Sequence, residues 1–161
     1  MHADHLPGAY GTVDRICLDA NCLIAGVASP TSPPGRILRN IASGRLSLQM
    51  SSSILDEYHE LAFKPRVVAL FNRYDVSRSE LSAMLTLLVE NASLVQLDGE
   101  APPCRDEDDR MYLHCALVSQ ADWLITRDKD LLEVGTIGTA AILVPEEFIQ
   151  QLDQGGVELE A

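Results

Sequence analysis

Short apolar runs alternate along the chain with stretches in which hydrophobic residues recur every three or four positions. The short runs predict strands at residues 15–18, 46–50, 93–97, 122–126 and 140–144, of which those at 15–18 and 122–126 read as buried. The periodic stretches predict helices at residues 36–43, 53–64, 67–74, 77–91, 109–120 and 146–152, and a short helical turn at 129–133. This alternation predicts an α/β protein with three α/β/α layers around a mostly parallel five-stranded sheet.

Capping and breaking residues set the expected ends of these helices. Ser53 followed by Asp56 is a capping pattern, which predicts the start of the helix at 53–64. Pro65 ends that helix, because proline has no backbone N–H to continue the hydrogen-bond ladder. Ser77 with Glu80 opens the helix at 77–91 in the same way.

Length and composition predict one folded domain. A chain of 161 residues that is 47% hydrophobic can fill a single core. The predicted elements place the domain at residues 14–152, with a flexible leader at 1–13 and an acidic tail at 153–161. The chain has no apolar run near the roughly 18–20 residues that span a bilayer, and its first residues lack the pattern of a signal peptide. We therefore expect a cytoplasmic protein without membrane association.

The cysteines agree with a reducing compartment. No two of the four are spaced as C-x-x-C, and no histidine completes a zinc-binding pattern. We expect reduced structural thiols, with Cys104 the most exposed of the set Cys17, Cys22, Cys104 and Cys115.

Four acidic residues stand where a carboxylate is locally out of place. Asp19 and Asp128 follow apolar runs that read as buried strands. Glu57 and Asp109 share a helical face with core residues, where a solvated acid is not expected. Each position has a simpler explanation: Asp19 can cap the next turn, and Asp128 can belong to a turn. Glu57 and Asp109 can stabilise the starts of their helices.

Topology brings these four acids together. In parallel sheets, sites form beyond the carboxyl ends of the strands, where Asp19 and Asp128 come. Glu57 and Asp109 can reach the same edge from the amino ends of their helices. Carboxylates are costly to desolvate, so several of them near a core indicate a bound cation. An oxygen-only set without histidine favours Mg²⁺ or Mn²⁺ over Zn²⁺.

The net charge weighs against a protein that binds nucleic acid tightly and without specificity. The chain carries 24 acidic and 12 basic residues, a formal charge of −12. Nonspecific nucleic-acid binders are usually basic, because phosphate contacts supply most of their affinity. Part of the excess charge belongs to the acidic quartet itself, which a bound metal ion would offset.

Four segments carry a resemblance to a known family. They are residues 18–24 (Leu-Asp-Ala-Asn-Cys-Leu-Ile), 53–61, 106–116 and 121–132, and residues 142–148 add a matching final strand and helix start. Together they resemble the PIN domain family of metal-dependent ribonucleases over about residues 14–152. The closest likeness is to the group described as toxin components of bacterial toxin–antitoxin systems. The resemblance implies a PIN-like, Rossmann-like fold.

The resemblance also implies roles for individual residues. The acidic quartet of the family falls on Asp19, Glu57, Asp109 and Asp128, as metal ligands and catalytic residues. Asn21 and Thr126 match residues that support the site, and Asp106, Asp108 and Asp130 match further acids often found in this group. The chain departs from the family at Ala20, where a threonine is usual; the change removes a hydroxyl but no carboxylate.

The leading hypothesis is therefore a Mg²⁺- or Mn²⁺-dependent endoribonuclease, the toxin of a toxin–antitoxin pair. The resemblance implies a small antitoxin partner that blocks the acidic pocket, and a homodimer. The sequence offers Arg36, Arg39, Arg45 and Arg127 as contacts for the RNA backbone, although each could equally be a solvated surface residue. A catalytically weak or inert PIN scaffold is the alternative. A phosphatase of the haloacid-dehalogenase type is disfavoured, because Asp19-Ala20-Asn21 lacks the second acid of its Asp-x-Asp motif.

Overall fold

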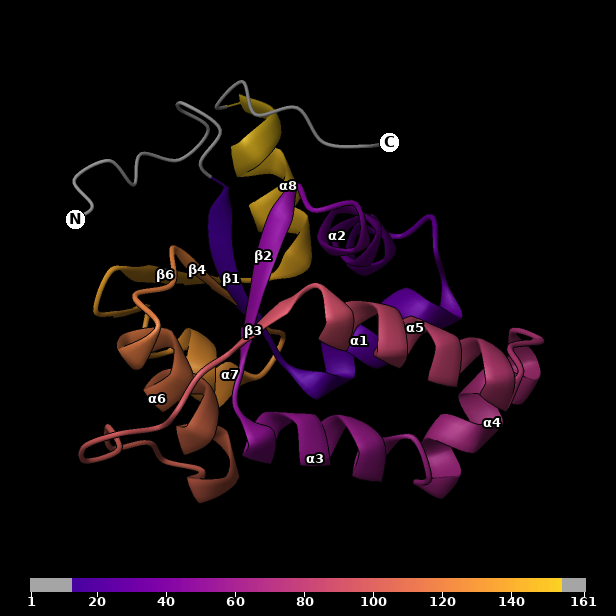
Figure 1. Ribbon diagram of the computed structural model, residues 1–161, viewed down its shortest axis with the longest axis horizontal. Helices are drawn as coiled ribbons and strands as arrows, with labels where there is room; N and C mark the ends of the chain where they lie inside the picture. The colour runs from indigo at the N-terminus through magenta and orange to yellow at the C-terminus, as the bar shows by residue number, and fades with distance from the viewer. Residues whose placement is uncertain (1–12, 155–161) are drawn as a thin grey trace.

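The computed structural model describes residues 13–154 of the chain (Figure 1). The strands are β1 (Asp14–Leu18), β2 (Leu46–Met50), β3 (Ala92–Leu94), β4 (Trp123–Ile125), β5 (Thr136–Ile137) and β6 (Ala140–Leu143). The helices are α1 (Ala20–Ala28), α2 (Pro33–Ala42), α3 (Ser52–Leu61), α4 (Pro65–Arg73), α5 (Arg78–Glu90), the 3₁₀ turn η1 (Glu107–Asp109), α6 (Arg110–Val118), α7 (Lys129–Leu132) and α8 (Pro145–Gln154). The predicted leader, except residue 13, and the predicted tail, except residues 153 and 154, lie outside the described residues.

The strands form one sheet in the order β3-β2-β1-β4-β6-β5. Each neighbouring pair is parallel except β5 and β6, which are antiparallel. The α/β prediction with a mostly parallel sheet is confirmed, but the described residues form six strands rather than five. The additional strand, β5, has two residues, which is too short to give a hydrophobic pattern in the sequence.

Helices cover the central strands on both sides of the sheet (Figure 1). α6 packs against β1, β2 and β4, while α1, α2 and α8 pack together and α2 contacts β2. The central strands β1 and β2 are buried along most of their length, as the apolar run of β1 predicts. Aliphatic side chains fill most of the core, and Tyr58, Tyr112 and Phe148 are its largest fully buried residues.

Helix α1 is absent from the prediction made from sequence. It begins directly after β1, with Asp19 as its N-cap, and seven of its nine residues are buried. A helix that is apolar on nearly every side has no amphipathic stripe, so hydrophobic periodicity does not reveal it. This missed helix matters because it fixes the backbone around Asp19.

The caps correct two predicted boundaries. Ser51, not Ser53, caps α3 by accepting a hydrogen bond from the Ile54 N–H at 3.2 Å. Pro65 follows the end of α3, as predicted, but it also occupies the first turn of α4, where its missing N–H costs nothing. Ser77 accepts from the Glu80 N–H at 3.1 Å, which confirms the predicted cap of α5.

The cysteines and the lengths of the helices bear on two predictions made from the sequence. All four cysteines are free; Cys17, Cys22 and Cys115 are buried and Cys104 is partly exposed. No helix among residues 13–154 has the length and apolar character needed to cross a membrane.

Close packing of the start of α2 against the loop that follows α1 generates a stability prediction. A Cβ at Gly35 would lie 2.3 Å from the Pro30 carbonyl oxygen and 2.5 Å from that of Ser29, both backbone atoms that cannot rotate away. We expect Gly35→Ala to lower the free energy of unfolding by about 1–3 kcal/mol, the usual range for overpacking. Urea denaturation measures this change. Ser82→Ala on the exposed side of α5 is the control and should shift stability by less than about 0.5 kcal/mol; equal effects would contradict the packing argument.

Candidate active site

Asp19 lies where β1 passes into α1, at the carboxyl edge of the sheet. Its backbone N–H donates to the Ile125 carbonyl of β4 at 3.1 Å. One carboxylate oxygen, Oδ1, accepts from the Cys22 N–H at 2.8 Å, and the other accepts from the Thr126 hydroxyl. Asp19 is only 6% exposed and Thr126 is fully buried. Asp19 is therefore a helix cap, as the simpler explanation holds, and also a buried carboxylate at the predicted site.

Thr126 links the first acid to the fourth. Its hydroxyl oxygen accepts from the Asp128 N–H at 2.9 Å while it donates to Asp19. Asp128 in turn caps α7, because its Oδ1 accepts from the Asp130 N–H at 2.8 Å. One hydroxyl thus fixes the backbone turn after β4 relative to the carboxylate after β1.

Two buried tyrosines connect Glu57 and its helix to this edge. Glu57 Oε1 accepts from the Tyr112 hydroxyl at 2.7 Å, and the same hydroxyl oxygen accepts from the Ala20 N–H at 3.2 Å. Tyr58, beside Glu57 on α3, donates to the Leu18 carbonyl at 2.6 Å. Partial burial raises the pKa of Glu57, and the charges of nearby acids raise it further, against the opposing effect of the Tyr112 hydrogen bond.

Asp109 is the most perturbed acid of the site. Its pKa is raised to about 7, chiefly by burial and then by a hydrogen bond and charge repulsion from Asp128. The charges of Asp106 and Asp19 add to the same effect. Asp109 Oδ2 is buried without a hydrogen-bond partner among the described residues. A buried acceptor of this kind is costly unless an external group binds it.

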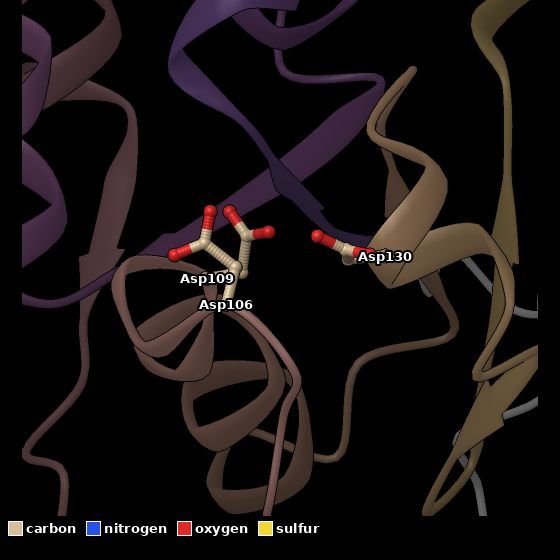
Figure 2. Close-up of side chains that lie close together, drawn as sticks. All are labelled: Asp106, Asp109 and Asp130. Atoms are coloured by element: carbon tan, nitrogen blue, oxygen red, sulfur yellow. The ribbon is translucent and has the colours of Figure 1, made fainter.

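Asp109 belongs to a compact acidic cluster, which we define as Asp106, Asp109 and Asp130. One carboxylate oxygen from each lies within 4.8 Å of the others. Figure 2 shows the carboxylates of Asp106 and Asp109 close to each other, with that of Asp130 directed toward them from α7. Asp106 also caps η1, because its Oδ1 accepts from the Asp108 N–H at 3.0 Å. Asp130 is partly balanced by Arg105, whose Nη1 lies 3.5 Å from its Oδ1.

The structure brings the predicted quartet into one neighbourhood. The Asp19 charge raises the pKa of both Glu57 and Asp109, and the nearby Asp128 carboxyl raises the pKa of Asp109 more strongly. Among the predicted supporting residues, Thr126 bonds to Asp19, while Asp106 and Asp130 join Asp109 in the cluster.

Two of the other supporting residues take less direct positions. Asp108 is exposed, and its charge acts on Glu57. Asn21 is exposed, and its amide oxygen accepts from Arg66 Nη2 at 3.0 Å. No hydrogen bond among the described residues joins Asn21 to the quartet, so its support of the site stays a prediction.

Sequence reasoning missed three contributors. Tyr58 and Tyr112 read as core residues, since helical spacing places them on the inward faces of their helices. Their hydroxyls have no signature in the sequence, because the atoms they bind come from segments 40 to 92 positions away. Arg105 had no signal either; its partners, Asp130 and Glu133, lie on and beside α7.

Comparison with known proteins identifies the family. A model of the PIN domain matches residues 15–130, which is most of the chain. The chain belongs to the PIN domain family. PIN domains are in general nucleases that act on RNA, and they typically bind divalent metal ions. An uncharacterized protein of Methanocaldococcus jannaschii is 26% identical over 149 residues, which cover 87% of this chain and 92% of that protein. No solved structure matches the chain.

The acids of this PIN domain fit a small hard cation. One carboxylate oxygen from each residue of the acidic cluster lies within 4.8 Å of the others. Two ligands on opposite sides of an octahedral Mg²⁺ stand about 4.2 Å apart, which is a similar spacing. Asp109 contributes an oxygen that otherwise lacks a partner. Burial raises the pKa of the neighbouring Cys22 thiol, and the Asp19 charge raises it further, so Cys22 stays neutral and is a poor ligand. The donor set is therefore oxygen, as Mg²⁺ and Mn²⁺ prefer.

The raised pKa of Asp109 predicts a pH-dependent stability of the metal-free PIN domain. Its pKa is about 7 in the folded state against 3.8 for the ordinary group, so between these values the folded state holds a proton that the unfolded state has lost. The free energy of unfolding should therefore fall as pH rises from about 4 to 7. We expect a loss of roughly 1 kcal/mol between pH 5.5 and 7.5, after a discount for solvent screening. Thermal unfolding in excess chelator measures it.

Two variants separate Asp109 from the other ionisable groups. Asp109→Asn should remove much of the pH slope and raise the melting temperature in chelator at pH 7.5, because it removes the repelled charge. Asp56→Asn, on the exposed side of α3, should keep the wild-type slope. If Asp109→Asn melts no higher than wild type and retains its slope, the acids do not strain one another.

Proposed function

We propose that this PIN domain is a metal-dependent endoribonuclease that hydrolyses RNA phosphodiesters with Mg²⁺ or Mn²⁺ as cofactor. Asp19, Glu57, Asp109 and Asp128 would be its catalytic acids and metal ligands. The observation that carries the proposal is Asp109, with a pKa near 7 and a buried oxygen that lacks a partner among the described residues. Perturbed acids that converge at the carboxyl edge of a parallel sheet are typical of functional sites.

The hydrogen bonds and charges around each acid indicate the role that it would take in the reaction. Both oxygens of Asp19 already accept hydrogen bonds, so its orientation is set before any ligand arrives. Asp109 and Asp128 repel each other through their charges, and a bound cation would relieve this repulsion. Glu57 keeps Oε2 available, and the upward shift of its pKa makes it a stronger base toward the attacking water. A divalent ion, when bound, supplies charge neutralisation for the phosphate and activation of water.

The supporting acids extend the same site. Asp106 and Asp130 lie against Asp109 and would complete the coordination shell, directly or through water. Asp108 would tune Glu57 through its charge, and Thr126 would hold Asp19 and the Asp128 turn in register. Asn21 lies two residues after Asp19 in the chain, and Arg66, which donates to the Asn21 amide oxygen, could meet a phosphate of the RNA.

Two of the four arginines proposed from sequence as RNA contacts form ion pairs with acidic side chains. Arg127 Nη2 lies 2.7 Å from Glu146 and Arg36 Nη2 lies 3.8 Å from Asp153. With a net charge of −12 as well, RNA affinity has to come from a few contacts near the site rather than from a basic face. We infer that the substrate is a short single-stranded or looped segment.

The physiological role we propose is that of a toxin paired with an antitoxin, in a homodimer. Support comes from the likeness of residues 106–116 and 121–132 to that group of PIN domains. The alternative is a scaffold with little or no activity, which Ala20 and the acidity of the chain favour. An antitoxin would insert basic groups into the acidic pocket.

A cleavage assay decides between enzyme and scaffold. Single-stranded RNA should be cut in Mg²⁺ or Mn²⁺, not in excess chelator, and poorly in Zn²⁺, because the donors are oxygen. Asp19→Asn and Asp109→Asn should each lower kcat by at least about 10²-fold, since each removes charge from the site that stabilises the transition state. The measurement is the initial rate on a labelled oligonucleotide.

The exposed Asp56→Asn variant controls for nonspecific loss of charge and should cleave like wild type. Circular dichroism establishes that every variant is folded. Turnover that persists in chelator, or wild-type cleavage by both site variants, excludes the proposed mechanism.

The toxin role has its own test. Expression of the wild-type chain alone should arrest bacterial growth, while Asp109→Asn should not. Co-expression with the small protein encoded next to it should restore growth and yield a stable complex, whose metal-dependent cleavage is inhibited. Growth arrest by Asp109→Asn equal to that by wild type would assign any toxicity to something other than the nuclease site.

A further inference from the structure

The residues on either side of Asp19 are each held by a buried tyrosine. Tyr58, on α3, donates its hydroxyl proton to the carbonyl of Leu18, which precedes Asp19. Tyr112, on α6, accepts at its hydroxyl oxygen from the N–H of Ala20, which follows Asp19. Both side chains are 1% exposed. The two hydroxyls are alike in burial, and each binds the main chain of a residue adjacent to Asp19, but they differ in what else they bind.

Only the Tyr112 hydroxyl also reaches an acid of the site. A phenol has one proton to donate, and the Ala20 N–H can only donate, so the proton of Tyr112 must point to Glu57 Oε1 at 2.7 Å. Glu57 Oε1 is therefore committed as an acceptor. Among the described residues Glu57 Oε2 accepts no hydrogen bond. The hydrogen bond from Tyr112 therefore makes the two oxygens of Glu57 different, because Oε1 is engaged and Oε2 is not.

We propose that Tyr112 is a positioning residue that reserves Glu57 Oε1 for itself and presents Oε2 to the reaction. This role rests on the proposed nuclease function, in which Glu57 is a catalytic acid. The Tyr112 hydroxyl is a fixed point, because the main chain of α1 holds it from one side and its ring is buried in the core. A carboxylate at the end of a flexible side chain loses most of its freedom when one oxygen is held in this way.

The position of Tyr112 ties three catalytic segments to one atom. It lies three residues after Asp109, one turn further along the same helix region, and its hydroxyl meets both the start of α1 and Glu57 of α3. Residue 20 is alanine, so its side chain offers Glu57 no hydroxyl, and the Thr126 hydroxyl is given to Asp19. Among the described residues, the side chain that donates a hydrogen bond to Glu57 is Tyr112.

A double-mutant cycle tests whether Tyr112 acts through Glu57. Tyr112→Phe keeps the ring and removes the hydroxyl; we expect kcat for RNA cleavage to fall about tenfold, the effect of one hydrogen bond to a charged group, with KM changed less than about twofold. In a Glu57→Ala background the same substitution should change the residual kcat by less than about twofold, because its target is gone. Tyr58→Phe is the matched control, since its hydroxyl binds main chain; its effect should be the same factor in both backgrounds.

Thermal unfolding of the same variants in chelator gives a second reading that does not depend on activity. The melting temperature lost on Tyr112→Phe should largely disappear in the Glu57→Ala background, whereas the loss on Tyr58→Phe should persist. Additive effects of Tyr112→Phe and Glu57→Ala, in the kinetic cycle or in the thermal cycle, overturn the inference. A wild-type chain that cleaves no RNA with any metal ion defeats the proposed nuclease instead, and the thermal cycle then decides alone whether Tyr112 holds Glu57.

Discussion

The burial of the Asp19 carboxylate is the constraint on which the site depends. A carboxylate with 6% exposure is tolerable only when its oxygens are hydrogen-bonded, and Asp19 uses Cys22 of α1 and Thr126 beyond β4 for that purpose. Those bonds join a strand end, a helix start and the next strand of the sheet. Because parallel pairing places the ends of β1 and β4 together, the interactions that satisfy Asp19 also place Asp128 and, through the tyrosines, Glu57. The contacts between the end of β1, the start of α1 and the end of β4 therefore support the fold and also position the acids.

The acids that this junction brings together also repel one another. Asp109 faces Asp106, Asp128 and Asp130 with one buried oxygen unpartnered among the described residues, and part of the compensation comes from Arg105, a largely exposed side chain. Native proteins keep such arrangements where a ligand uses them, since a neutral asparagine would be easier to hold. A site that strains the metal-free protein binds a cation more favourably, because binding removes the strain as well as adding contacts.

The sequence predicts elements whose hydrophobic pattern lies within one short segment, but it does not predict contacts between segments far apart in the chain. The runs at β1 and β2 and the stripes of α2 and α5 are visible because burial there is periodic or continuous. Helix α1 is hidden by burial on nearly every side, and β5 by having two residues. Asp19 was recognisable as an acid that follows an apolar run, and Asp109 as an acid on the inward face of a helix, yet the pairing of Tyr112 with Glu57 depends on positions 55 apart. The contact of Asn21 could not be read from the sequence either, because its amide oxygen accepts from Arg66, 45 positions away, and its support of the acids stays a prediction.

The acidity of the chain bears on how such a site could work. A basic nuclease can hold RNA anywhere along a charged face, but here the arginines proposed from sequence are partly taken by Glu146 and Asp153. Under the proposed nuclease function, binding energy would have to arise at the scissile phosphate, where a bound cation would reverse the local charge. This arrangement favours interactions made in the transition state over general attraction to nucleic acid, and so favours turnover over tight retention. If the proposed antitoxin exists, its basic groups would gain at these acids the electrostatic attraction that the rest of the surface denies to RNA.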